Sequence, residues 1–159
     1  ITKLNNLRMK NLFALLFLLV FSSCGYNPIF KNTSISNDFR INIIKMQGDA
    51  KINNIIKKQL ELKSNENSKK IYDVSLETNY SEIILAKDTS GAITNYQLVV
   101  NSTFRVNFRN QTIDLTFSES LKMKNISDSL EKLSYEKNIK NNFASSLVDK
   151  LIVKIVTLQ

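Results

Sequence analysis

Cys24 is the residue whose type and position most clearly predict chemistry, because it is the only cysteine in a chain of 159 residues. It follows the unbroken apolar run Leu12–Phe21 and the two small residues Ser22 and Ser23. The segment opens on Met9-Lys10, which supplies a positive charge. A charged start, a short apolar run and small residues before a cleavage point are typical of a secretory signal peptide. Because this one ends at a cysteine, we interpret it as a lipoprotein signal, in which the peptide is cut before Cys24 and the thiol is alkylated with diacylglycerol.

A transmembrane helix or a buried core helix is the alternative interpretation of the apolar run. The run holds ten residues, which is half of the ~20 that a bilayer-spanning helix needs. We therefore expect residues 1–23 to contain upstream residues and the signal peptide, with Met9 as the favoured translation start. Residues 24–38, which include the only proline, Pro28, would form a lipidated tether. Residues 39–159 would form a single domain.

The composition argues against an enzyme. The chain has no histidine, which removes the commonest general base and metal ligand at neutral pH. With its single thiol acylated, it would also lack a cysteine nucleophile or a thiolate ligand. Ser–Lys and paired-carboxylate catalysis remain by elimination, but no Gly-x-Ser-x-Gly motif or glycine-rich phosphate loop is present. We therefore expect no catalysis, no cofactor and no metal site.

The first ordered elements are predicted from apolar spacing. Phe39, Ile41 and Ile43 alternate with polar residues, which is typical of a half-buried strand. Asp49 is placed to cap a helix in which apolar residues recur at helical spacing, with an end near Lys63.

A second strand is predicted from Tyr72, and its apolar residues change parity along the way. Up to Leu76 they are even-numbered, whereas Ile83 and Leu85 are odd-numbered. A slip of one residue turns a strand inside out unless a bulge absorbs the extra residue. We therefore expect a bulge or bend at Tyr80–Glu82.

The third and fourth strands form the clearest pair in the sequence. They follow a turn predicted at Asp88–Gly91 by its residue types. One face of Tyr96–Phe108 is apolar except for a single serine, and the other face is mainly polar. A tight turn at Asn110-Gln111 would pair Phe108 with Ile113, so that the apolar faces of the two strands coincide.

The last element is predicted to be a helix, which Ser127 or Asp128 can cap. Its recurring apolar residues are Leu130, Leu133, Ile139, Phe143, Leu147, Leu151, Ile155 and Leu158. The order is β-α-β-β-β-α, which predicts an α+β two-layer sandwich: a four-stranded, mainly antiparallel sheet with two helices on one face.

Two helices cover only one side of such a sheet, so the other side should remain open. We expect the open side to present a partner-facing surface that includes Asn101, Thr103, Asn107, Thr116 and Ser118. One interpretation is an ordinary solvated face, which antiparallel sheets commonly have. The other is a face that packs against a hydrated wall, such as the polar interior of an outer-membrane barrel.

Three cations are candidate ligands for lipid phosphate. Arg105 and Arg109 lie four residues apart on a predicted strand, hence on one face and about 13 Å apart. Lys87 precedes the turn at Asp88. The formal net charge of +8 favours anionic partners. Because the chain is expected to be exported, we expect no nucleic-acid partner. The alternative to phosphate binding is that these three cations only keep the surface soluble.

Four segments carry a resemblance to a known family. They are the start Cys24-Gly25-Tyr26-Asn27-Pro28-Ile29-Phe30, the strand and helix of Phe39–Leu60, the hairpin Asp88–Leu98 and the helical C-terminus. Together they resemble the lipopolysaccharide-assembly lipoproteins of the LptE family, in its alphaproteobacterial branch.

The resemblance implies a protein that is lipid-anchored at the outer membrane, on its periplasmic side. It implies that the chain plugs the β-barrel of an LptD-type translocon, assists that barrel's assembly and binds lipopolysaccharide. The family's fold, two helices over a four-stranded sheet, agrees with the order predicted from the residues. A different class stays open: a lipoprotein adaptor or pilotin for another envelope complex, without a lipid ligand.

Overall fold

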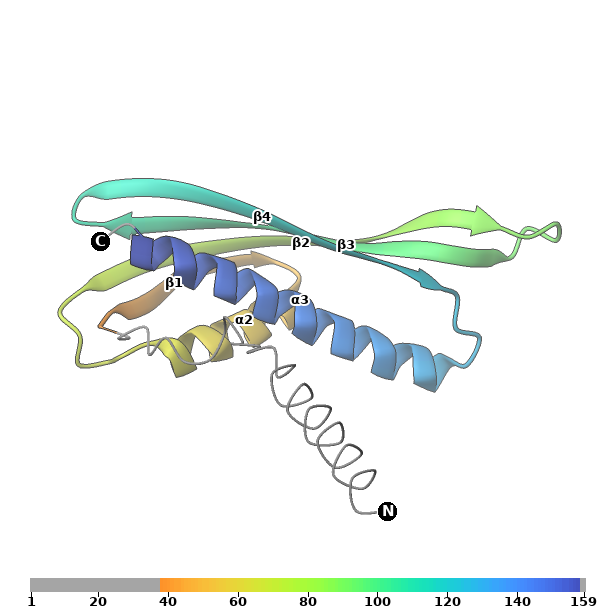
Figure 1. Ribbon diagram of the computed structural model, residues 1–159, viewed down its shortest axis with the longest axis horizontal. Helices are drawn as coiled ribbons and strands as arrows, with labels where there is room; N and C mark the ends of the chain where they lie inside the picture. The colour runs from red at the N-terminus through yellow and green to blue at the C-terminus, as the bar shows by residue number, and fades with distance from the viewer. Residues whose placement is uncertain (1–37, 158–159) are drawn as a thin grey trace, which may run out of the picture. The chain divides into compact units, whose positions relative to one another are not determined.

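The computed structural model describes residues 38–157, so the signal peptide, Cys24, the tether before Asp38, and Leu158 lie outside the described residues. The six elements are β1 (Arg40–Gly48), α2 (Ala50–Lys63), β2 (Ile71–Lys87), β3 (Ile93–Phe108), β4 (Gln111–Lys124) and α3 (Ser129–Thr157) (Figure 1). The predicted order and the α+β two-layer class are confirmed.

The four strands form one sheet in the order β1-β2-β3-β4. The β2–β3 and β3–β4 pairs are antiparallel hairpins, whereas β1 and β2 are parallel because α2 carries the chain back between them. Both helices lie on the same side of the sheet (Figure 1). The sheet is therefore mixed, with antiparallel pairing predominant, and no element of residues 38–157 covers its second side.

The start of α2 is fixed by polar contacts to the middle of β2. Asp49 caps the helix as predicted, since its Oδ1 accepts the Ile52 amide proton at 2.9 Å. The Asp49 amide donates to the Thr78 backbone oxygen at 3.2 Å, and Asn53 bridges the Thr78 hydroxyl and the Gln47 carbonyl, each at 2.8 Å. These bonds position α2 over the sheet.

The bulge expected at Tyr80–Glu82 is wrong. The pairing of β2 with β3 runs without interruption through this segment, and its register shifts only around Ala86. The expectation failed because it required Ile83 and Leu85 to share the core face. Instead this end of the hairpin projects past the helices (Figure 1), and these side chains are 47% and 44% exposed.

The β3–β4 turn lies one residue earlier than predicted. Arg109 and Asn110 occupy its two central positions with φ of 47° and 63°, and Val106, rather than Phe108, pairs with Ile113. Positive φ at both positions suits a two-residue hairpin because it matches the twist of the strands. The register differs from the expected one by two residues, so each side chain of β3 and β4 stays on the side of the sheet that was predicted.

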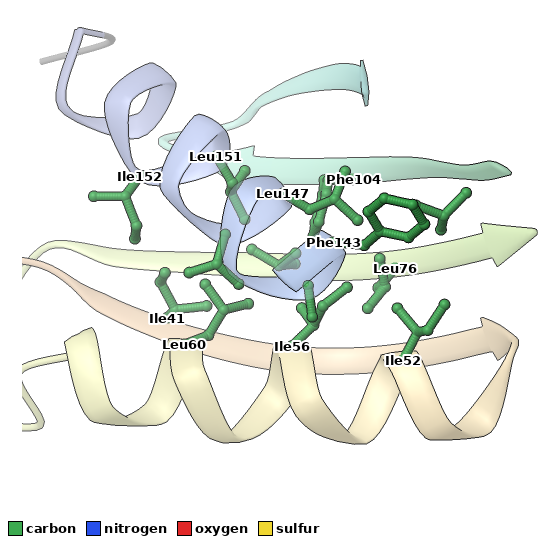
Figure 2. Close-up of a cluster of buried hydrophobic side chains, with 14 of the residues drawn as sticks. Ile41, Ile52, Ile56, Leu60, Leu76, Phe104, Phe143, Leu147, Leu151 and Ile152 are labelled. Atoms are coloured by element: carbon green, nitrogen blue, oxygen red, sulfur yellow. The ribbon is translucent and has the colours of Figure 1, made fainter. Parts of the chain in front are cut away.

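The core lies between the sheet and the helices, as predicted. Phe104 on β3 is fully buried, in one cluster with Ile56 of α2 and Leu147 of α3 (Figure 2). Leu98, Val100 and Val106 of the same β3 face are buried as well, as are Ile52 of α2 and Phe143 of α3. Phe108 is half-buried, with its ring stacked on that of Tyr72 at 4.2 Å.

The first turns of α3 lie outside this core, although their spacing suggested otherwise. Asp128 caps the helix, since its Oδ1 accepts the Glu131 amide proton at 2.8 Å. Leu130 and Leu133 are 78% and 60% exposed, and continuous burial begins only at Ile139. These leucines follow helical periodicity, but no element of the described chain covers them.

Phe104→Ala should lower the free energy of unfolding by about 3–5 kcal/mol, because it empties a fully buried ring site. Chemical denaturation measures the loss. Asn101→Ala, on the exposed side of the same strand, is the control and should change stability by less than about 0.5 kcal/mol. A loss under about 1 kcal/mol for Phe104→Ala would contradict the assignment of faces.

Candidate interaction surface

The side of β3 and β4 that faces away from the helices is polar; we call it the open face. Its residues are Asn101, Thr103, Arg105, Asn107, Thr112, Asp114, Thr116 and Ser118. On β3 they alternate with side chains that are buried beneath the sheet, such as Phe104 and Val106. All five residues predicted to face a partner therefore lie together on this surface.

Pairs of side chains join the two strands across the open face. The Thr103 and Thr116 hydroxyls lie 3.1 Å apart. The Thr112 hydroxyl donates to Asn107 Oδ1 at 2.7 Å. Directly opposed pairs of this kind stabilise a sheet and fix the orientation of its side chains. The open face is consequently a plane of hydroxyl and amide groups that are already ordered.

The Arg105–Asp114 pair carries the strongest electrostatic interaction of the open face. Arg105 Nε donates to Asp114 Oδ1 and its Nη2 donates to Oδ2, both at 2.8 Å. This hydrogen bonding lowers the pKa of the Asp114 carboxyl and raises the pKa of the Arg105 guanidinium. The cation predicted to meet a phosphate is therefore already matched by a carboxylate on the neighbouring strand.

The structure does not bring the three predicted cations together. Arg109 lies in the β3–β4 turn and not on the strand beside Arg105, and its guanidinium carbon sits 4.8 Å from the centre of the Phe108 ring. Lys87 ends β2 next to the first residues of β3, so it lies at the opposite end of the β2–β3 hairpin. The expected pair of arginines about 13 Å apart on one strand is wrong, because the turn begins one residue earlier.

A shallow hollow extends the open face toward β1. It has a volume of about 140 Å³ and is lined by Lys45, Gln47, Ser75, Leu76, Glu77, Thr103 and Arg105. Because both signs of charge and several amide and hydroxyl groups line it, it can accept polar side chains of a partner. It offers no enclosed apolar site.

An exposed apolar segment at the far end of β2 was missed by the sequence analysis. Ile83, Ile84 and Leu85 are 47%, 49% and 44% exposed. The signal was present as three consecutive apolar residues, which cannot all face one side of a strand. The turn beyond them is ordered, since Asp88 Oδ1 accepts the amide protons of Ser90 and Ala92.

Residues 38–157 contain neither a cluster of metal-ligating side chains nor a membrane-spanning helix. No group of three or more acidic or cysteine side chains is arranged there to hold a metal ion. No helix in that range combines the length and the apolar character needed to cross a membrane.

Two solved bacterial structures share this fold. Rare lipoprotein B from Shewanella oneidensis aligns with a TM-score of 0.55 at 12% identity, over 74% of this chain and 98% of that chain. A protein from Caulobacter crescentus CB15 assigned as a lipoprotein aligns with a TM-score of 0.53 at 10% identity, over 77% and 90% of the two chains. No family model and no curated protein sequence matches this chain. At such identities the likenesses establish the fold.

The pH dependence of Asp114 tests the ion pair. Because its pKa is lowered in the folded state, the pair stabilises the fold above the pKa of the unfolded chain and loses this effect as the pH falls through the folded value. Titration followed by carbon NMR should show the Asp114 carboxyl ionising below its usual range, and Arg105→Gln should raise that pKa. Arg109→Gln is the control and should leave it unchanged. Equal titration in both variants would contradict the pairing.

Proposed function

We propose that this protein is a lipoprotein of the outer membrane that assembles with a β-barrel of the LptD type, plugs it, and takes part in lipopolysaccharide transport. The role we propose is one of binding and assembly, without catalysis. The observation that carries the proposal is the open face, a broad polar side of the sheet that the helices leave uncovered (Figure 1).

The chemistry of the open face suits the inner wall of an outer-membrane barrel. Such a wall is polar, because lipid-facing and lumen-facing residues alternate along its strands. Between Asn101 and Asn107 the open face presents no large apolar side chain. Its hydroxyl and amide groups are held in position by cross-strand pairs, so binding a polar wall requires little further ordering of side chains.

The far end of the β2–β3 hairpin suits an acylated, phosphorylated ligand. Ile83, Ile84 and Leu85 supply exposed apolar surface, and Lys87 follows them on the same strand. Lipopolysaccharide combines acyl chains with phosphates, which are the two groups that such a surface can contact. Of the three cations predicted for this role, Lys87 is the one that adjoins exposed apolar residues, whereas Arg105 is bound by Asp114.

The lipid anchor is proposed from the sequence before the described residues. Cys24 ends the predicted signal peptide, and the proteins of similar fold from Shewanella oneidensis and Caulobacter crescentus described above are named as lipoproteins. Diacylation or triacylation would give stable membrane attachment, which a single acyl chain does not. Gly25 adds no charge after the cysteine, which favours the outer membrane as the destination.

Charge placed on the open face should disrupt the complex without unfolding the protein. Thr116→Glu alters an exposed position and loses one cross-strand hydroxyl pair, so it should lower stability by about 1 kcal/mol or less. Thr103→Glu also places a carboxylate opposite Glu77 of β2, so it should cost somewhat more while the protein stays folded. Against a barrel wall each carboxylate would lose water without gaining a partner. The acylated protein, extracted in detergent, should therefore co-purify less of the barrel when it carries either variant.

Ser134→Glu is the matched control, because Ser134 is exposed on α3, on the opposite side of the sheet. It should bind the barrel as the wild type does. Thermal melts of all three variants separate a binding defect from unfolding. Normal barrel binding by both threonine variants would show that the open face is simply solvated, and would leave the adaptor or pilotin role in place of the plug.

Mass spectrometry of the membrane-extracted protein tests the anchor. The mature N-terminus should be Cys24 and should carry two or three acyl chains. Cys24→Ser removes the thiol that is alkylated, so the precursor should stay uncleaved by the lipoprotein peptidase. An unacylated wild-type protein recovered from the aqueous fraction would contradict this part of the proposal.

A further inference from the structure

One long edge of the sheet has no partner within the described chain. β4 spans 14 residues and pairs only with β3, so no segment among residues 38–157 bonds to its outer edge. Unpaired backbone groups along an edge are a template for pairing with another strand. The opposite edge is a poorer template, because β1 has nine residues and a register break between Ile43 and Lys45.

The apolar side of β4 is incompletely covered. Leu115 and Phe117 are half-buried against the core, Ile113 is also half-buried, and Leu121 is 37% exposed. They point toward the helix layer, where β3 and α3 cover them from one side only. A strand added at the β4 edge would continue the sheet and remove this apolar surface from water.

We propose that β4 pairs antiparallel with β4 of a second copy of this chain, with Ser118 opposite Ser118. A two-fold axis perpendicular to the sheet would then relate the copies and place both helix layers on the same side. This proposal does not rest on the barrel proposal, because its pairing is made by the backbone of the β4 edge, with only the side chains at the border of the open face taking part.

The side chains of β4 are complementary to themselves in this register. On the open face, Asp114 of each copy lies opposite Lys122 of the other. On the helix side, Leu115 lies opposite Leu121, and Ile113 lies opposite Met123. Opposite charges and apolar pairs that face each other directly across strands are stabilising. Asp114 already accepts from Arg105, so the second cation would approach the same carboxylate from the opposite side.

The neighbouring registers that keep the faces matched are less favourable. A shift of two residues in one direction places Glu119 opposite Glu119 of the second copy, and like charges opposed in this way are destabilising. A shift of two in the other direction places Glu119 opposite Leu115 and leaves Asp114 opposite Ser120. The register centred on Ser118 avoids the pair of opposed carboxylates and is the one of the three that places Asp114 opposite Lys122. In it Glu119 faces Phe117 of the second copy while it stays bound to Ser146 and Lys150 of its own α3. This charge complementarity of β4 with itself selects a second copy as the occupant of the edge.

A cysteine at the symmetry axis tests the pairing directly. Residues directly opposite each other in an antiparallel pair have Cα atoms about 4.5–5.5 Å apart, which is within the range of a disulfide. Ser118→Cys, in the full chain carrying Cys24→Ala and purified in detergent, should therefore form a disulfide dimer under mild oxidation. The Cys24→Ala background makes the introduced thiol the only one.

Ser120→Cys in the same background is the matched control. In the proposed register its two copies would lie four residues out of line, roughly 13 Å apart, so it should dimerise on the order of ten-fold less than Ser118→Cys. A mixture of Thr116→Cys and Ser120→Cys should form the mixed disulfide, because these positions face each other. Equal dimer yields for Ser118→Cys and Ser120→Cys, or no dimer from either, would overturn the proposal.

A charge reversal separates specific pairing from random collision. Lys122→Glu added to Ser118→Cys places a carboxylate opposite Asp114 of the second copy, once at each end of the β4–β4 pair. This repulsion should reduce the yield of disulfide dimer by at least about three-fold. Adding Asp114→Lys to that variant restores opposite charges and should recover the yield. Circular dichroism melts confirm that each variant is folded. An unchanged yield with Lys122→Glu would equally overturn the register.

Discussion

The close junction between the end of β1 and the middle of β2 is the constraint on which the arrangement of layers depends. A Cβ atom at Gly48 would lie 1.6 Å from the Thr78 carbonyl oxygen, and Gly48 has φ of +91°, so only glycine fits there. Asp49 follows at once and caps α2, while its second carboxylate oxygen accepts from Lys140 of α3 at 2.9 Å. Within three residues the chain leaves the sheet, starts one helix and bonds to the other.

Electrostatics reinforce this junction. Partial burial alone would raise the pKa of Asp49, but the Ile52 amide and the Lys140 ammonium outweigh it and hold the pKa below its usual value. The Lys140 ammonium also lies 4.0 Å from the centre of the Tyr80 ring. This one cation of α3 therefore contacts both Asp49, which caps α2, and Tyr80 of the sheet. Because these contacts hold both helices on one side, no described helix covers the polar side of β3 and β4.

The elements, their order and the faces of the sheet could be predicted because each depends on local apolar spacing. The β3 face was correct from Tyr96 to Val106, and the caps Asp49 and Asp128 were predicted from residue type. The bulge on β2 was misplaced because the sequence does not show where the helices stop covering the sheet. The turn at Arg109 was misplaced because two adjacent registers preserve the same faces and differ only in which residues adopt positive φ.

For the candidate surface, the sequence placed the polar residues on one face but could not reveal how they pair. Arg105 is neutralised by Asp114 through a strand register that parity alone does not specify. Likewise, exposure of Ile83 and Leu85 depends on the length of α3 relative to the hairpin. Periodicity reports which residues share a side, and tertiary coverage decides whether that side is buried.

The parallel pairing of β1 has a consequence for the order in which the chain acquires its structure. β2, β3 and β4 meet through short connections, whereas Asn42 and its partner Asp73 are 31 positions apart. Closing a longer loop costs more entropy before any contact compensates for it. We therefore expect the three-stranded meander to form first and β1 to dock last, although β1 leaves the ribosome first. Until β1 docks, the edge of β2 that pairs with it remains exposed. A nascent molecule of this protein is therefore most prone to pair with other chains along this edge, which β1 covers in the native structure.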